Sequence, residues 1–369
     1  MVRNEDIQQT FEQLVTIDSP SLQEREMAKY IKKMFAEIGI SLKEDDTAKV
    51  TGSTAGNLYG YVQGDGEKAP LLLSVHMDTV QPACGKKAVT AQDGTVRSDG
   101  TTVLGADDLA GVTEIYHAVK YFKENQKTHR DIELLFTVGE ELYGIGVKAF
   151  DCSQLKSKSA YVLDLSGEIG QAAYAAPTII SFCAIVKGRS AHAGFCPEDG
   201  VNAILAASNA ISQLPQGKVD AQTTANIGMI SGGEGVNIVS EKCVVRGEIR
   251  SLRHEAAVSL ADRYREVFEK EAQTLGAALE WDETVDIKAY ETNADSAVVR
   301  EYKEAVQKAG LEARLLKTFG GSDNNVLAEY GIEGLVIANS MHRVHTCQEY
   351  TNIGEMKKVV EILVSLLEE

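Results

Sequence analysis

The stretch LLLSVHMD, residues 71–78, places two polar side chains directly after a run of apolar ones. The apolar part predicts a strand that is buried on both faces. His76 stands at the end of this strand, and Asp78 follows two residues later. A histidine in this position can ligate a metal ion while the carboxylate orients its other ring nitrogen. By itself, the pair is more typical of ordinary polar residues at a strand end.

Further acidic residues lie at or near the ends of other predicted strands. They are Asp107 in GADDLAG (105–111), Glu140 and Glu141 after a strand over 132–138, and Asp164 in a strand over 160–167. The strands alternate with helices, one of them over 112–122, as in a mostly parallel sheet that helices cover on both faces. Because ligands bind beyond the carboxyl ends of the strands in such sheets, we expect these residues to gather at one edge.

The N-terminal hundred residues carry the remaining elements of this half. We predict helices over 4–16 and 22–38, strands over 57–64 and 71–77, and a polar loop over 81–102. Ser21 and Glu24 have the spacing of a capping box at the start of the second helix, which Gly39 would end.

The pattern changes at about Pro177, where a β-α-β-β-α-β order begins. This order matches a ferredoxin-like unit. Its elements are a strand from Ile179, a helix over 201–213, strands over 223–230 and 242–250, a helix over 254–275 and a strand over 278–288. After Asn293 the α/β pattern resumes, with helices over 295–309, 323–329 and 353–368 and strands over 312–317 and 334–338. We therefore predict an α/β domain over 1–176 and 290–369, interrupted by a smaller α+β domain over 177–289.

Composition limits the classes of function. With 369 residues, the chain is long enough for two domains. Apolar residues make up 44% and charged residues 25%, as in ordinary globular proteins. A formal charge of −17 argues against nucleic acid or an anionic membrane as the partner. We find neither a signal peptide nor an apolar run long enough to span a bilayer, and the six cysteines are scattered. We therefore expect reduced thiols and a cytoplasmic location.

The polar residues fit a pair of metal ions when they are considered together. Two neighbouring divalent ions need several nitrogen or oxygen ligands and a bridging carboxylate. The candidate ligands are His76, Asp107, Glu141, Asp164 and His345. Adjacent acids that leave a strand point to opposite sides, so one of Glu140 and Glu141 can ligate while the other acts as a general base. Each residue alone has an ordinary explanation, such as a helix N-cap, a solvated helix start or a polar strand end.

The motifs HMDTV, GADDLAG, TVGEELYG, YVLDLSG and a late His-Thr-x-x-Glu occur in this order along the chain. In this order and spacing they resemble the M20 family of co-catalytic zinc aminopeptidases and carboxypeptidases, over essentially the whole chain. Within that family the chain is most similar to the tripeptidase (peptidase T) group, through LGADDLAG followed by VGEE. The family often has lysine after the two aspartates, where this chain has Leu109.

The resemblance implies a role for each candidate. Two divalent ions are implied, with zinc as the first choice and cobalt or manganese as alternatives that suit the same ligands. His76 and Asp164 would hold one ion, Glu141 and His345 would hold the other, and Asp107 would bridge them. Glu140 would be the general base for a metal-activated water, and Asp78 would orient His76. The resemblance also implies a cis peptide bond between Asp107 and Asp108.

The inserted domain resembles the lid and dimerisation domain of the same family. His192 in GRSAHAG would stabilise the oxyanion, often in the partner subunit's site, although a turn with an incidental histidine is the alternative. Asn237 and Arg250 match substrate-contacting positions, with Arg250 gripping a carboxylate or, alternatively, forming a surface ion pair. Gly320 and Gly321 in GGSDNN would let the main chain approach the substrate, unless they form a plain turn.

The sequence thus predicts a homodimeric metallopeptidase that removes the N-terminal residue from short peptides. Other M20 activities remain open, namely dipeptidase, N-acyl amino acid deacylase and carboxypeptidase. A non-catalytic binding protein on the same fold is disfavoured because every ligand type and the base are present. Cys347 lies close to His345, but no Cys–His–Asn framework supports a thiol enzyme.

Overall fold

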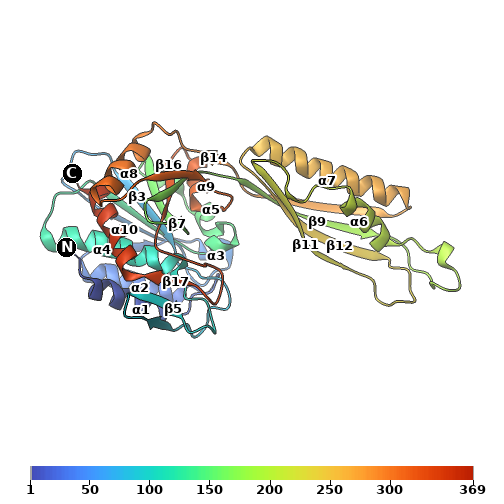
Figure 1. Ribbon diagram of the computed structural model, residues 1–369, viewed down its shortest axis with the longest axis horizontal. Helices are drawn as coiled ribbons and strands as arrows, with labels where there is room; N and C mark the ends of the chain where they lie inside the picture. Colours follow the sequence, from blue (N-terminus) through green and yellow to red (C-terminus); the bar gives the residue numbers. More distant parts are fainter. Residues whose placement is uncertain (1, 369) are drawn as a thin grey trace. The chain divides into compact units, whose positions relative to one another are not determined.

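The computed structural model describes residues 2–368 (Figure 1). The chain divides into two compact units, and each is described by itself. The first contains the residues through Ala175, Glu291–Thr318 and the chain from Ser322 onward, and the second contains Ala176–Tyr290 together with Phe319–Gly321. The sequence analysis assigned 319–321 to the first domain. These residues group with the second because the Phe319 carbonyl accepts a hydrogen bond from Arg250.

Over residues 2–368, a nine-stranded sheet forms the centre of the first unit, in the order β1-β2-β6-β3-β7-β16-β8-β14 with β15 beside β8. The strands β6, β3, β7 and β16 are parallel to one another, and β2 and β8 add antiparallel pairs at the flanks. The strands are β1 (Leu42–Glu44), β2 (Leu58–Val62), β3 (Leu71–His76), β6 (Ile132–Thr137), β7 (Ser159–Leu165), β8 (Gln171–Ala176), β14 (Tyr290–Glu291), β15 (Arg314–Lys317) and β16 (Glu333–Ala338). The predicted α/β class with a mostly parallel sheet is confirmed.

Helices cover both faces of this sheet, which explains why β3 is buried along its whole length. Leu71, Leu73 and Val75 face a large core, whereas Leu72 faces a smaller one on the opposite side. The large core is shared with α1 (Asn4–Val15), α2 (Arg25–Glu37), α4 (Ala106–Asn125), α8 (Ala297–Lys308) and α10 (Ile353–Leu367). The smaller core takes side chains from α5 (Ile145–Ala149) and α9 (Asp323–Glu329), and a short helix, α3 (Ala48–Thr51), contacts α5.

Two local predictions were wrong. Ser21 and Glu24 do not form a capping box, because α2 begins only at Arg25 and both side chains bind loops near the sheet edge instead. The predicted loop over 81–102 contains two short strands, β4 (Ala88–Thr90) and β5 (Thr95–Ser98). β5 pairs with β17 (Tyr350–Asn352), and the sequence pattern carries no signal of that distant partner.

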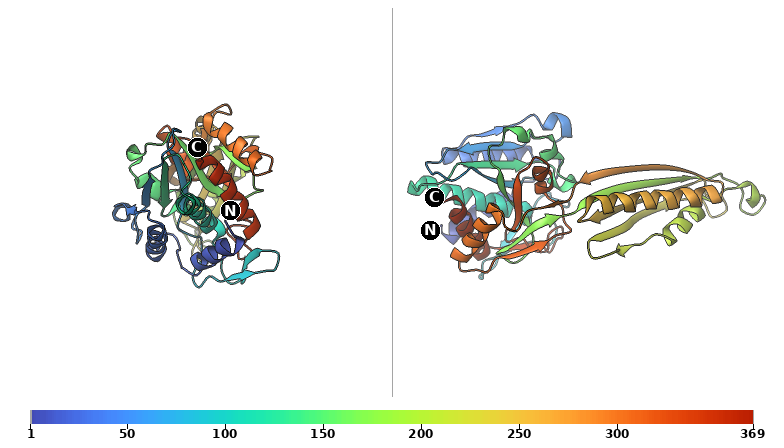
Figure 2. Two further views of the ribbon diagram at one scale, coloured as in Figure 1. Left: turned by 90° about the vertical axis from the view of Figure 1, so that its left-hand side faces the viewer. Right: turned by 90° about the horizontal axis from the view of Figure 1, so that it is seen from above.

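The second unit holds the ferredoxin-like arrangement that the sequence predicts. Its antiparallel sheet has the order β10-β11-β12-β9-β13, and two helices pack on one face (Figures 1 and 2). The elements are β9 (Thr178–Lys187), α6 (Ala203–Ser212), β10 (Gly217–Lys218), β11 (Thr223–Gly232), β12 (Lys242–Ser251), α7 (His254–Thr274) and β13 (Ala278–Ile287). The first strand of the motif lies between the third and fourth, as in a split β-α-β unit.

Two further expectations concern the chain as a whole. All six cysteines are free thiols, as expected. Among residues 2–368, none of the helices combines the length and the apolar character that crossing a bilayer requires.

The core of the second unit centres on Phe182, which stacks on Trp281 with a centroid distance of 5.0 Å. Because Phe182 is buried, we expect Phe182→Ala to destabilise this unit by about 3–5 kcal/mol. Trp281 is the single tryptophan of the chain, so its fluorescence during denaturant unfolding reports on this unit. Lys270→Ala, on the exposed side of α7, is the control and should change stability by less than about 0.5 kcal/mol. Equal midpoints for the two variants would contradict the assignment of the core.

Candidate metal centre

The residues predicted to bind metal gather at the carboxyl edge of the parallel strands. His76 is the last residue of β3, and Asp164 lies near the end of β7. Glu140 and Glu141 begin a short 3-10 helix (Glu140–Leu142) that follows β6. Asp107 is the second residue of α4, and His345 lies in the loop after β16. The ligand atoms of His76, Asp107 and Glu141 lie within 4.8 Å of one another, and so do those of His76, Glu140 and Asp164.

Asp107 lies between the two histidines. Its Oδ1 is 2.9 Å from Nε2 of His76, and its Oδ2 is 3.2 Å from Nε2 of His345. Nε2 of His345 is also 3.0 Å from Oε1 of Glu141. One carboxylate thus directs each of its oxygens at a histidine from a different segment, as a carboxylate that bridges two ions must do.

The candidate carboxylates are buried close to one another, and this shifts their pKa values. Burial raises the pKa of Glu140 well above its ordinary value, and the neighbouring Asp164 raises it further. Burial raises the pKa of Asp164 in the same way, with an added contribution from Asp107. Burial would also raise the pKa of Asp107, but the hydrogen bonds with His345 and His76 outweigh it and lower that pKa. The contacts with Asp107 and Glu141 raise the pKa of His345 to about 10.

This donor set fits divalent cations. Imidazole and carboxylate groups are the ligands of catalytic zinc sites and also suit cobalt and manganese. Oε1 of Glu141 is buried and lacks a hydrogen-bond donor, since its contact with His345 is close but outside hydrogen-bond geometry. In the described part of the chain, the ion pairs of Asp107 and Glu141 are with histidines alone. Cations would supply the positive charge that these buried carboxylates require.

Asp78 has a broader role than the sequence indicates. Nδ1 of His76 lies 2.9 Å from the main-chain oxygen of Asp78 and 3.4 Å from its carboxylate. The carboxylate accepts hydrogen bonds from the main-chain N–H groups of Glu140 (3.0 Å) and Glu141 (3.3 Å) and from the Ser21 hydroxyl (2.7 Å). Asp78 therefore orients the His76 ring through its main chain and holds the two glutamates through its side chain.

Asp108 binds the main chain of His76 with its buried side chain. The Asp107–Asp108 peptide is cis, as the resemblance implies. The Asp108 side chain is fully buried and accepts hydrogen bonds from the His76 main-chain N–H and from Nδ2 of Asn339. A Cβ at Gly111 would lie 2.4 Å from Oδ1 of Asp108, so this close packing requires glycine. Leu109, where relatives often have lysine, is buried in the core of the first unit and places no charge at the site.

Two buried glutamates were missed by sequence reasoning. Glu24, read as part of a capping box, accepts a hydrogen bond from the main-chain N–H of Gly139, directly before Glu140. Glu349, the last residue of the His-Thr-x-x-Glu motif, accepts one from the main-chain N–H of Asp107. The motif spacing was the available signal for Glu349, whereas the function of Glu24 depends on a distant segment that its own sequence does not indicate.

His192 and Asn237 lie on neighbouring segments of the second unit. The main-chain N–H of Ala193 donates to the carbonyl of Asn237, and that of Val239 donates to Ala191. Nδ1 of His192 accepts hydrogen bonds from the main-chain N–H groups of Gly194 and Phe195, both at 3.1 Å. A neutral ring with Nδ1 as acceptor carries its proton on Nε2, so the exposed His192 presents a hydrogen-bond donor.

Arg250 and the predicted glycine loop also lie together in the second unit. Nε and Nη2 of Arg250 form a fork with the Glu248 carboxylate at 2.8 and 2.9 Å, and Nη1 donates to the Phe319 carbonyl at 2.8 Å. A Cβ at Gly321 would lie 2.2 Å from Cδ1 of Ile287, so the loop packs there only without a side chain. The ion-pair alternative for Arg250 is therefore realised, and three of its five N–H groups are engaged by these bonds.

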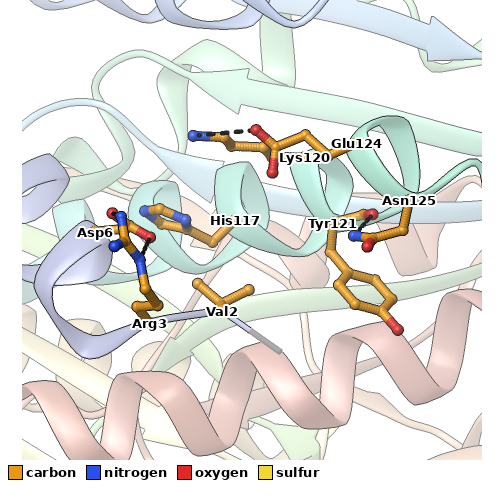
Figure 3. A pocket seen from close by; sticks show the side chains of 8 residues that line it. All are labelled: Val2, Arg3, Asp6, His117, Lys120, Tyr121, Glu124 and Asn125. Carbon is orange, nitrogen blue, oxygen red and sulfur yellow. Dashed lines mark hydrogen bonds and ion pairs between the residues drawn. The ribbon is translucent and has the colours of Figure 1, made fainter.

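A pocket of about 370 Å³ in the first unit is a separate feature (Figure 3). Its charged side chains pair with one another, as Arg3 does with Asp6 and Lys120 with Glu124. Burial lowers the pKa of His117, which also lines this pocket, to about 4, and its Nε2 lies 2.9 Å from the Thr10 hydroxyl. These side chains already have ion-pair or hydrogen-bond partners within the chain. We therefore prefer the candidate metal centre over this pocket as the catalytic site.

Family models of known proteins match two parts of the chain. The model for the peptidase dimerisation domain of the M20 family matches residues 174–275, and the model for peptidase family M28 matches residues 57–176. The uncharacterized protein YqjE of Bacillus subtilis is 39% identical over 369 residues, which cover 100% of this chain and 99% of that protein. Peptidase T of Clostridium perfringens is 29% identical over 74% of this chain and 67% of its own length.

Two solved peptidase structures match almost the whole chain. The aminopeptidase PepT from Bacillus cereus has a TM-score of 0.92 and 37% identity, covering 99% of this chain and 98% of its own. A tripeptidase from Staphylococcus aureus has a TM-score of 0.97 and 33% identity, covering 100% and 98%. The protein is therefore a peptidase with a dimerisation domain inserted into its α/β domain. It belongs to the M20 family and, within it, to the peptidase T-like group.

Proposed function

We propose that this peptidase uses two divalent metal ions, zinc in the first place, to hydrolyse the N-terminal peptide bond of short peptides. The observation that carries the proposal is the position of Asp107, whose two carboxylate oxygens face His76 and His345 at 2.9 and 3.2 Å. His76 and Asp164 would hold one ion, and Glu141 and His345 would hold the other. In support, an M20 peptidase from Bacillus subtilis with the same fold is described as binding a dinuclear metal.

Bound ions would supply Lewis-acid stabilisation of the carbonyl oxygen and would lower the pKa of the attacking water. Glu140 has no ligand role in this scheme and lies beside His76 and Asp164. Its carboxylate would take the proton from the water and pass it to the nitrogen of the leaving amine. The hydrogen bond from the Glu140 main-chain N–H to Asp78 would fix where this proton is received.

We further propose that the chain forms a homodimer through the second unit and that His192 acts in the partner's site. Large apolar side chains are exposed there, among them Phe195 at 86%, Met229 at 66% and Val236 at 106%. Among residues 2–368, the strand β11 pairs on its outer side only with the two residues of β10, which leaves an edge that favours pairing with a second chain. The Nε2 donor of His192 is suited to stabilising an oxyanion.

The length of the substrate follows from two anchors in this proposal. A free α-amino group would meet the acidic metal centre, and the C-terminal carboxylate would bind the two N–H groups of Arg250 that Glu248 and Phe319 leave available. One extended residue spans roughly 3.3–3.6 Å, so a peptide that is one residue too long or too short misplaces one end. A shift of about 1 Å can cost 10²-fold in rate, which favours tripeptides. The description of the Staphylococcus aureus relative as a tripeptidase supports this preference.

Replacing Glu140 tests the base. Glu140→Gln keeps the shape of the side chain but cannot accept the proton, so we expect kcat to fall by at least about 10²-fold. Elemental analysis should find close to two divalent ions per chain, by this proposal, in both the wild type and the variant. The matched variant Glu141→Gln should lose metal as well as activity. If Glu140→Gln loses metal and Glu141→Gln retains it, the two roles are reversed.

A mixing experiment tests whether His192 acts between chains. Neither His192→Ala nor Glu140→Gln should be active alone, but a mixed dimer has one site with an intact base and the partner's intact His192. Random re-association should therefore restore roughly a quarter of the wild-type activity. A monomeric mass by light scattering, or no recovery after confirmed exchange of subunits, would contradict the proposal.

Capping the substrate tests the second anchor. The wild type should cleave a tripeptide with a free C-terminus faster than its amide, and Arg250→Ala should abolish this difference by slowing only the free form. Arg246→Ala is the matched control, since Arg246 lies on the same strand and the same face. Equal rates for the free and amidated peptides with the wild type would rule out the two-ended grip.

A further inference from the structure

Glu349 is a buried carboxylate whose hydrogen bonds go to one turn of main chain. Its side chain is 1% exposed. Oε2 accepts hydrogen bonds from the main-chain N–H groups of Leu104 (2.7 Å) and Gly105 (2.8 Å), and Oε1 accepts one from that of Asp107 (2.9 Å). The contacts therefore surround the residue that would bridge the two ions.

These contacts hold the irregular first turn of α4. Asp107 and Asp108 have non-helical main-chain torsions, and Oδ1 of Asp108 accepts a hydrogen bond from the N–H of Gly111, so the regular part of the helix has its own cap after this turn. The N–H groups of Leu104, Gly105 and Asp107 lie before that cap, and buried N–H groups require an acceptor. Glu349 supplies this acceptor from a distant segment. The same carboxylate therefore fixes the position of the main chain from which the Asp107 side chain extends.

Glu349 also connects the segment that carries His345 with the segment that carries Asp107. It lies four residues after His345, and its own main-chain N–H donates to the carbonyl of Thr346. The segment that carries His345 is thus attached to the segment that carries Asp107 at two points. One is the contact between the two side chains at 3.2 Å, and the other is the set of hydrogen bonds to Glu349.

We infer that Glu349 is a positioning residue of the metal centre. Its carboxylate sets the place of the Asp107 bridge relative to His345 and so sets the affinity for the pair of ions, without touching an ion or the substrate. The inference rests on the proposed two-metal function and adds a determinant of that site. It predicts that the loss of a single hydrogen bond, the one to the Asp107 N–H, weakens metal binding.

Glu349→Gln removes that hydrogen bond selectively. An amide has one oxygen and one NH₂ group. The oxygen retains two hydrogen bonds if it faces Leu104 and Gly105, and the NH₂ group then faces the N–H of Asp107, donor against donor. Groups that position metal ligands typically contribute 10–100-fold to metal affinity.

Glu133 provides a matched control for a role in folding alone. Its carboxylate is fully buried in the same unit and accepts hydrogen bonds from the main-chain N–H groups of Lys156 and Ser157 and from the Tyr59 hydroxyl. Glu133 lies at the start of β6, whereas the metal centre lies beyond the end of that strand. Glu133→Gln therefore disturbs an equivalent set of hydrogen bonds away from the candidate ligands.

The experiment is a titration of the metal-free full chain with Co²⁺, followed by visible absorption and calorimetry, together with thermal unfolding of the metal-free proteins. We expect two ions in the wild type, a loss of about 10–100-fold in the affinity for at least one ion in Glu349→Gln, and unchanged affinities in Glu133→Gln. Wild-type affinities in Glu349→Gln, or an equal loss in Glu133→Gln, would overturn the inference.

Glu349→Asp covers the case in which the glutamine variant does not fold. It keeps the charge but draws the carboxylate back by one methylene group, so it should fold and bind the ions more weakly than the wild type. If neither Glu349 variant folds while Glu133→Gln does, the carboxylate is an element of the fold and the positioning assignment is wrong. A wild type that binds no Co²⁺ would instead refute the proposed function.

Discussion

Carboxylates that are buried close together repel one another, and the rest of the first unit is arranged around that repulsion. Asp107, Glu140, Glu141 and Asp164 lie at one edge of the parallel sheet, where burial already disfavours their charged forms. The protein offsets part of this with His76 and His345, which contact Asp107 and Glu141. Bound cations would neutralise these carboxylates without protonating them, so the electrostatic cost of the site is also the basis of the metal affinity that we propose.

Three buried carboxylates near the candidate ligands bind the main chain in the same way. Asp78, Glu24 and Glu349 each accept hydrogen bonds from main-chain N–H groups. The donors belong to the candidate ligands Asp107 and Glu141, to the proposed base Glu140 and to Gly139 directly before it. A hydrogen bond to the main chain fixes the position of the Cβ atom of the neighbouring functional residue. Few rotamers of that residue can then reach the site. The segments that carry Asp107, Glu140 and Glu141 in the candidate metal centre are therefore each bound by a carboxylate from another part of the chain.

The sequence sufficed for the fold class, and its candidate ligands lie together in the structure, because both expectations rest on short patterns. An apolar strand followed by a polar residue is visible in LLLSVH, and parallel strands imply that their ends converge. Contacts between distant segments were not visible. The sequence could not show that Ser21 binds Asp78, that β5 pairs with β17, or that Glu248 occupies the Arg250 fork, because each depends on which loops meet in space.

The position of β16 also bears on how the protein is made. β7 and β8 follow each other closely in the chain, but β16, which comes after the whole second unit, lies between them in the sheet. A chain emerging from the ribosome therefore exposes β8 long before its neighbour exists. It also lacks His345, which comes later than β16. A peptidase built in this order cannot assemble its proposed metal centre before the segment that carries His345 has been synthesised, so activity requires the part of the chain that follows the whole second unit.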